Sequence, residues 1–173
     1  RVFEAALRDV PHIICYAAKA NSNLAIMRLF VKEGGGVDIV SGGELYRALQ
    51  VGADPGKIVY SGVGKRIDEI DFALRAGILM FNVESSEELG VINERAGLLG
   101  TKARISLRIN PDVDPKTHPH ISTGLKSNKF GINIEKSLDE YRRARTLPHV
   151  QIVGVDCHIG SQVTQISPFI DAL

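Results

Sequence analysis

The chain has 173 residues, of which 44% are hydrophobic and 6% aromatic, and its formal net charge is +1. This length and composition suit one globular domain or part of a larger protein. The near-zero charge, the absence of tryptophan and the few aromatic rings argue against a nucleic-acid or membrane-surface partner. No apolar stretch reaches the roughly 20 residues that span a bilayer, and the first residues do not form a signal-peptide pattern.

Runs rich in β-branched residues alternate along the chain with amphipathic segments. Six runs are predicted to be strands: Ile13–Ala18, Val37–Ser41, Ile58–Ser61, Leu79–Val83, Ala103–Ile109 and Val150–Ile159. Between them, apolar residues recur with the helical period, as at Leu24, Met27 and Val31. The predicted helix starts are Asn21 to Asn23, Ser85 with Glu88, and Ser137 with Glu140. The predicted helix ends are Gly34–Gly36, Gly52, Gly77 and Gly97.

This alternation predicts an α/β fold with a parallel sheet and helices outside it. Two architectures fit, an open doubly wound sheet or part of a (β/α)₈ TIM barrel. The regular repeat and the lack of a dinucleotide fingerprint after the first strand favour a partial barrel with about six strands. Because the sequence begins and stops inside helical patterns, we expect residues 1–173 to be one barrel domain that is incomplete at both ends.

Every predicted strand ends in small or polar residues, and the carboxyl ends of parallel strands are where such folds carry out chemistry. These ends are Lys19 to Asn21, Ser41 to Glu44, Ser61 with Gly62, Asn82 with Glu84, Arg108 with Asn110, and His158 with Ser161. Simple capping of strands at the surface would instead produce a scatter of Lys, Glu and Asp. The pattern therefore favours a site at this edge of the sheet.

Two residues at these ends deserve separate hypotheses. Strand alternation would place Lys19 on the same face as Cys15 and Ala17, where the ammonium group is either a surface residue or a desolvated nucleophile. His158 is either a hydrogen-bonded structural histidine or a flat face for stacking on a ligand. In the second case, Gly160 and Ser161 would leave backbone N–H groups available for an anion. The residue pattern alone leaves both alternatives open.

Other candidate motifs are weaker. "SGVGK" lacks the Ser or Thr and the first glycine of a phosphate-binding P-loop. His118 and His120 have no paired cysteine or carboxylate at a spacing that closes a metal site, so no metal is predicted. Cys15 and Cys157 lie within apolar runs, which predicts reduced, buried thiols in a cytoplasmic protein.

Six segments carry a resemblance to a known family: "YAAKAN", "VDIVSGGEL", "FNVES", "LRINPDV", "HPHISTGLKSNKFGI" and "VDCHIGSQ". Together they span nearly the whole chain and resemble the pyridoxal-phosphate decarboxylases of alanine-racemase-like fold. "YAAKAN" and "KFG" also fit the ornithine and arginine decarboxylases of that group. "VSGGEL" and the "HPHISTG" loop narrow the resemblance to the diaminopimelate decarboxylase family, whose members have an N-terminal barrel and a C-terminal β domain.

The resemblance implies a role for four residues. Lys19 matches the lysine that binds the aldehyde of pyridoxal 5'-phosphate, and His158 matches the histidine stacked on the cofactor ring. Ser161 matches a serine near the cofactor phosphate, and Arg108 matches an arginine that lines the active site. Lys19 and His158 are therefore the expected catalytic residues. No role is assigned to Glu44, Asn82 or the 120–131 loop.

The resemblance also implies an activity, the decarboxylation of meso-diaminopimelate to L-lysine and CO₂, which is the last step of lysine biosynthesis. The alternatives are an ornithine- or arginine-type decarboxylase, a racemase of the same fold, and a non-catalytic pyridoxal-phosphate protein. The resemblance further implies a homodimer in which the partner subunit completes the site. Its phosphate loop, its glutamate facing the pyridine nitrogen and its catalytic cysteine come later in the family's chain, so residues 1–173 are expected to be inactive alone.

Overall fold

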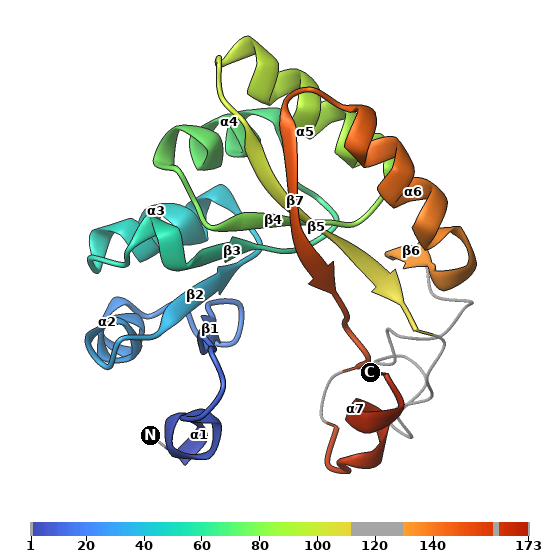
Figure 1. Cartoon of the computed structure of the whole chain (residues 1–173). Coiled ribbons are helices and arrows are strands. Elements are labelled where there is room, and N and C mark those ends of the chain that lie inside the picture. The colour runs from blue at the N-terminus through green and yellow to red at the C-terminus, as the bar shows by residue number, and fades with distance from the viewer. Residues whose placement is uncertain (1, 112–129, 161–162, 173) are drawn as a thin grey trace. The chain divides into compact units, whose positions relative to one another are not determined.

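The computed structural model describes residues 2–111, 130–160 and 163–172 (Figure 1). The chain divides into two compact units. Unit 1 is Arg1–Phe81 and unit 2 is Asn82–Leu173, and the boundary between them falls inside one strand. All strand pairings given below are parallel. No helix in the described ranges is long and apolar enough to cross a membrane.

Unit 1 alternates strands and helices. Its elements are α1 (Val2–Leu7), β1 (Cys15–Ala17), α2 (Leu24–Lys32), β2 (Gly36–Ile39), α3 (Gly42–Gln50), the 3₁₀ helix η1 (Pro55–Lys57), β3 (Ile58–Tyr60), α4 (Ile67–Ala76) and β4 (Met80–Val83). Consecutive strands are neighbours, with β1 paired to β2, β2 to β3, and β3 to β4. Val37, Ile39 and Ile58 are fully buried because strands of a parallel sheet are covered on both faces.

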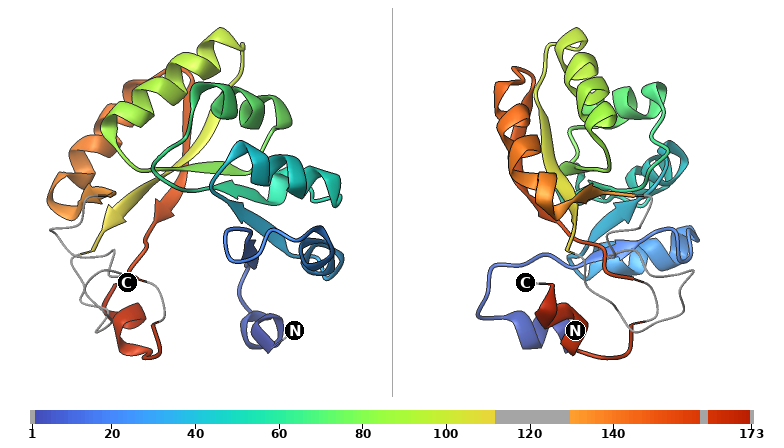
Figure 2. Two further views of the ribbon diagram at one scale, coloured as in Figure 1. Left: turned by 180° about the vertical axis from the view of Figure 1, so that it is seen from behind. Right: turned by 90° about the vertical axis from the view of Figure 1, so that its right-hand side faces the viewer.

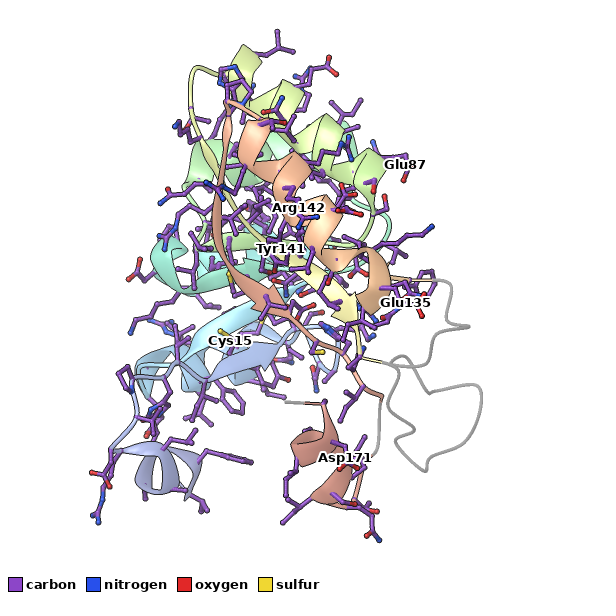
Figure 3. The ribbon with its side chains drawn as sticks, turned by 45° about the vertical axis from the view of Figure 1, so that its right-hand side comes forward. Cys15, Glu87, Glu135, Tyr141, Arg142 and Asp171 are labelled. Atoms are coloured by element: carbon purple, nitrogen blue, oxygen red, sulfur yellow. The ribbon has the colours of Figure 1, made fainter. Side chains whose placement is uncertain are left out.

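Unit 2 continues the same pattern. Its elements after β4 are α5 (Ser86–Leu98), β5 (Ala103–Asn110), β6 (Ile132–Asn133), α6 (Ile134–Thr146), β7 (Val150–Asp156) and α7 (Ser167–Asp171). β5 pairs with both β6 and β7, and α6 runs alongside β5 in both views of Figure 2. Tyr141, labelled in Figure 3, projects from α6 and donates a hydrogen bond of 2.9 Å to the carbonyl of Gly154 in β7.

β5 divides its side chains between two faces, and this division positions the site. Ala103, Ile105, Leu107 and Ile109 alternate with polar residues that point to the opposite face. Ser106, Arg108 and Asn110 form that polar face and are at most 5% exposed. The sequence therefore builds one apolar face and one buried polar face from a single strand.

The predicted helix starts and ends are confirmed in unit 1. The Asn23 side chain accepts a hydrogen bond from the Ala25 N–H at the start of α2. Gly34, Gly52 and Gly77 follow their helices with φ values of 90°, 81° and 68°, a left-handed conformation that glycine adopts without steric cost.

In unit 2 one predicted cap is confirmed and two predictions are wrong. The hydroxyl of Ser85 accepts from the Glu88 N–H at the start of α5, as expected. Ser137 does not begin a helix, because Asn133 already caps α6, and the Ser137 hydroxyl donates to the Ile134 carbonyl within that helix. Gly97 does not end α5, which continues to Leu98.

The six predicted strands all occur, but several are shorter than expected. β1 stops at Ala17 and β7 at Asp156, so the residues after them belong to turns or loops. β6 was not predicted, since two residues give too short a pattern to detect. The prediction that both thiols are buried is wrong, because Cys15 is half-buried and Cys157 is exposed.

Candidate active site

Lys19 follows β1 in unit 1 and lies in a turn. The Ala20 N–H donates to the Ala17 carbonyl at 3.0 Å, and this bond turns the chain immediately after the strand. The side chain of Lys19 is exposed, and among the described residues its ammonium group makes no hydrogen bond or ion pair. The predicted common face with Cys15 and Ala17 assumed that the strand continues to Lys19, but β1 ends at Ala17.

Neighbouring strands of unit 1 fasten this turn in place. The Ala18 N–H donates to the Asp38 carbonyl of β2 at 2.9 Å. The Asp38 carboxylate accepts a hydrogen bond of 2.6 Å from the hydroxyl of Ser61, which follows β3. Hydrogen bonds along the carboxyl ends of three adjacent strands thus fix the backbone from which Lys19 projects.

Two polar residues after β2 have a local structural role. The hydroxyl of Ser41 accepts from the Glu44 N–H at 3.2 Å, and Glu44 Oε2 accepts from the Val40 N–H at 2.8 Å. These bonds satisfy two backbone donors, one inside the first turn of α3 and one just before the helix. The polar residues Ser41 and Glu44 at this strand end are therefore explained by their role at the start of the helix.

Arg108 of β5 forms a buried ion pair in unit 2. Its Nη1 donates to Glu84 Oε1 at 3.0 Å and to Oε2 at 2.8 Å, and the two side chains are 7% and 3% exposed. The Nε of Arg108 is buried and has no hydrogen-bond partner among the described residues. An unsatisfied buried donor costs free energy, so this nitrogen is a candidate for contact with a ligand.

A second polar pair lies beside the first on the same strands. The hydroxyl of Ser106 donates to Asn82 Oδ1 of β4. Asn82 and Glu84 are two residues apart, as are Ser106 and Arg108, so both pairs share one face. The Nδ2 of Asn110 extends this face by donating to the Phe130 carbonyl.

His158 lies two residues after the end of β7, half-buried in unit 2. Its Nδ1 is 2.9 Å from Asp156 Oδ2, and the two side chains are 40% and 15% exposed. The hydrogen bond to Asp156 raises the pKa of His158, and the charges of Asp156 and Glu84 act in the same direction. Desolvation and the positive charge of Arg108 oppose this increase in pKa.

Both cysteine thiols have a raised pKa, and burial is the main cause in each case. Burial, followed by the charge of Asp38, raises the pKa of Cys15 to about 11, so the thiol is protonated at neutral pH. Burial is also the main cause that raises the pKa of Cys157. In the described ranges no three His, Cys, Asp or Glu side chains gather as metal ligands. His118, His120 and Ser161, together with most of the 120–131 loop, lie outside the described residues.

The predicted residues are therefore found in two groups. Lys19 belongs to unit 1, whereas Arg108 and His158 belong to unit 2. Sequence reasoning gave no role to Glu84 or Asp156. The sequence nevertheless contains a pattern that could have indicated both residues. Glu84 follows an apolar strand, and Asp156 stands two residues before a histidine.

Comparison with known proteins identifies the chain's relatives. Residues 1–173 match the family model described as pyridoxal-dependent decarboxylase, pyridoxal binding domain. Diaminopimelate decarboxylase from Pseudomonas aeruginosa is 55% identical over 173 residues, which are 100% of this chain and 42% of the relative. The enzyme of the same name from Vibrio cholerae is 56% identical over 170 residues, or 98% of this chain and 41% of the relative. The chain thus spans about two-fifths of the length of these relatives.

Solved structures agree with this result. A crystal structure of Helicobacter pylori diaminopimelate decarboxylase complexed with L-lysine has a TM-score of 0.95 and 49% identity, covering 98% of this chain and 43% of that one. An arginine decarboxylase from Paramecium bursaria Chlorella virus has a TM-score of 0.83 at 24% identity over 99% of this chain and 44% of that one, which shows a shared fold alone. These neighbours confirm the prediction of a partial α/β barrel.

Proposed function

Because the chain belongs to the pyridoxal-dependent decarboxylase family through its pyridoxal binding domain, we propose that the full-length protein decarboxylates meso-diaminopimelate. The products are L-lysine and CO₂, in the last step of lysine biosynthesis. The observation that carries this proposal is the 55% identity to a diaminopimelate decarboxylase over all 173 residues. The lower identity of 24% to an arginine decarboxylase makes that substrate the weaker candidate.

The described residues fit pyridoxal 5'-phosphate. Covalent attachment to an aldehyde needs an amine that structural bonds do not occupy, and the Lys19 ammonium group is exposed at the end of β1. An anionic substrate or cofactor needs cationic partners. The Nε of Arg108 is a buried donor that no described residue accepts from, so it can donate to such an anion. His158 offers a half-buried aromatic ring whose Nδ1 is held by Asp156.

Each residue would then have a distinct task. With the cofactor bound, Lys19 would be the residue that holds its aldehyde covalently. His158 would pack against the cofactor ring, and Arg108 would line the substrate side. Ser161, which lies outside the described residues, is proposed to bind near the phosphate.

The reaction replaces a carboxylate by a proton. The bond from Cα to the carboxylate breaks, CO₂ leaves, and a proton added at Cα gives L-lysine. The bound cofactor supplies the electron sink that accepts the electron pair left at Cα. The protein must hold the breaking bond perpendicular to the ring, which is a demand on orientation rather than on acid strength. We propose that two restraints serve this orientation, each within its own unit: the hydrogen bond at Ala18 and the hydrogen bond that holds the imidazole of His158.

Chemical trapping tests the attachment site. The full-length protein is incubated with pyridoxal phosphate, reduced with borohydride, digested, and mapped by mass spectrometry. We expect the label on Lys19, and a label on any other lysine would contradict the proposal. Lys57 is a built-in comparison, because its ammonium group already donates to the Gly34 carbonyl at 2.9 Å.

Substrate identity needs a separate assay. We expect CO₂ release from meso-diaminopimelate to exceed release from ornithine or arginine, and preferred release from either of those would favour the alternative decarboxylases. Racemisation without CO₂ release would favour a racemase. Absorbance of bound cofactor without any turnover would favour a non-catalytic protein.

We also propose that residues 1–173 are one pyridoxal-phosphate-binding barrel domain, that the protein is cytoplasmic, and that it acts as a homodimer. The support is membership of the family. Light scattering on the full-length protein should give the mass of a dimer. Mixing a Lys19→Ala variant with a variant of the partner-supplied cysteine should restore activity if the partner completes the site, and no restored activity would oppose that arrangement.

A further inference from the structure

Asp156 is the carboxylate in contact with the imidazole proposed to face the cofactor. It is the last residue of β7, and its Oδ2 lies 2.9 Å from His158 Nδ1. We infer that Asp156 is a positioning residue, which holds the His158 ring in one orientation and one tautomer against the cofactor. The inference rests on the proposed function, because only there does the His158 ring face a cofactor.

The chemistry of the pair fixes the tautomer. An ionised carboxylate only accepts hydrogen bonds, so the hydrogen in this contact belongs to Nδ1 of His158. The bond also restrains rotation about the ring's χ2 torsion, which is otherwise soft. A carboxylate that accepts from one ring nitrogen of a functional histidine sets both properties at once.

The backbone around His158 is anchored on both sides. The Cys157 thiol donates to the Ile109 carbonyl of β5 at 3.3 Å. Ile159 is only 6% exposed, so its side chain packs in the interior. The remaining freedom of His158 is therefore rotation of its own side chain, which is the motion that Asp156 restrains.

Asp156 also belongs to a row of alternating charges across unit 2. In the sheet register it pairs with Arg108 of β5, and paired residues of neighbouring strands point to the same face. Arg108 is itself fixed by Glu84 through both carboxylate oxygens. The order from β4 to the end of β7 is thus carboxylate, guanidinium, carboxylate and imidazole.

This row predicts how His158 responds to pH. Asp156 and Glu84 favour the protonated ring, whereas Arg108 and burial disfavour it. Tyr141 on α6 and Cys157 also face Asp156, and for both groups burial is the first cause of a raised pKa and the charge of Asp156 acts in the same direction. Removal of the Asp156 charge should therefore lower the pKa of His158.

Two substitutions separate charge from geometry. Asp156→Asn keeps an acceptor oxygen without the charge, and Asp156→Ala removes both. Asp139→Asn is the matched control, because Asp139 is 79% exposed and pairs only with Arg142 on the surface of α6 among the described residues. Each variant of the full-length protein is titrated by NMR without cofactor, with His12 as an internal reference, and its thermal midpoint is recorded.

The same variants are then loaded with pyridoxal phosphate. We expect both Asp156 variants to lower the pKa of His158, while His12 and the Asp139→Asn variant keep the wild-type titration. Asp156→Ala should lower kcat and cofactor affinity by about tenfold to a hundredfold with little change in KM, which is the effect of misplacing a group near the reaction. Asp156→Asn should lose less, because its oxygen still accepts from Nδ1.

The outcomes distinguish this inference from the proposed function. An unchanged His158 titration in both variants, or wild-type kcat and cofactor affinity in a folded Asp156→Ala protein, would overturn the positioning role. A wild-type protein that binds no pyridoxal phosphate would overturn the proposed function. In that case the NMR titration still decides whether Asp156 holds the imidazole.

Discussion

The two units treat the polar residues at their strand ends differently. In unit 1, Lys19 is exposed in a turn and Asp38 is half-buried beside Ser61. In unit 2, Glu84 and Arg108 are almost fully enclosed. Within the described ranges, the buried polar residues of unit 1 are Ser61 and Asp71, whereas those of unit 2 are Asn82, Glu84, Ser106, Arg108 and Asn110.

The contrast separates the exposed lysine that we propose to hold the cofactor from polar residues that are buried and paired. A buried charge is tolerated only with a partner, and Glu84 with Arg108 supplies one. Such a pair contributes little net stability compared with well-packed apolar side chains, yet it orders the groups around it. We interpret unit 2 as a fixed polar frame and Lys19 of unit 1 as a side chain that the fold itself does not require.

The largest expected effect is a loss of activity on removal of the Lys19 side chain, and it tests that interpretation. Lys19→Ala in the full-length protein should reduce kcat by about 10³-fold or more, because removing a covalent nucleophile removes its whole pathway. Its free energy of unfolding should stay within about 0.5 kcal/mol of wild type, as for other exposed substitutions. Steady-state kinetics and urea unfolding measure the two quantities. Lys57→Ala is the control that should retain activity, and a strongly destabilised Lys19→Ala protein would break the comparison.

The next effect lies in unit 2. Glu84→Ala should lower the free energy of unfolding by about 3–5 kcal/mol, since it leaves the Arg108 guanidinium buried without its carboxylate. Asp139→Ala, which removes an exposed ion pair, should cost under about 1 kcal/mol. Urea unfolding curves compare the variants, and a double Glu84→Met, Arg108→Met variant should recover much of the loss. Equal small losses for Glu84→Ala and Asp139→Ala would contradict the idea of a fixed frame.

A smaller effect should be the same in both units. Ser41 caps α3 in unit 1 and Ser85 caps α5 in unit 2, each by accepting from a backbone N–H at 3.2 Å. Replacement of either residue by Ala should cost about 1 kcal/mol. Chemical unfolding of the two variants, with Thr at the same positions as a control that restores the acceptor, checks this. A large difference between Ser41→Ala and Ser85→Ala would show that the units differ in more than their buried charges.

The smallest effect concerns pH. The pKa of His158 is raised mainly by its hydrogen bond to Asp156, so the folded state binds a proton more tightly than the unfolded state. The resulting stabilisation is complete below the ordinary value of 6.5 and is lost as the pH rises through the raised pKa. Because the side chain is 40% exposed, solvent screens the effect to below about 1 kcal/mol. Thermal midpoints across this range should fall less in Asp156→Asn than in wild type, and parallel curves would contradict the prediction.

Local sequence patterns predicted much of the fold. The six predicted strands and the caps at Asn23 and Ser85 came from the spacing of apolar and capping residues alone. Ser137 shows where this fails, because a capping-box spacing recurs by chance and Asn133 was available four residues earlier. The prediction that Gly97 ends a helix fails for a tertiary reason, since a Cβ at this position would lie 2.7 Å from the His149 ring. The glycine is therefore needed for close packing against His149 and not for a helix end.

The sequence by itself determined the α/β alternation, the strand order along the chain and the motifs around Lys19, Arg108 and His158. These features depend on residues close together in the chain, whose spacing is written in the sequence. Only the tertiary structure decided that Glu84 forms a buried ion pair with Arg108, that Asp156 is hydrogen-bonded to His158, and that Lys19 lies in an exposed turn after its strand. Burial and ion pairing depend on which strands become neighbours and where each strand stops, and neither is fixed by local propensity.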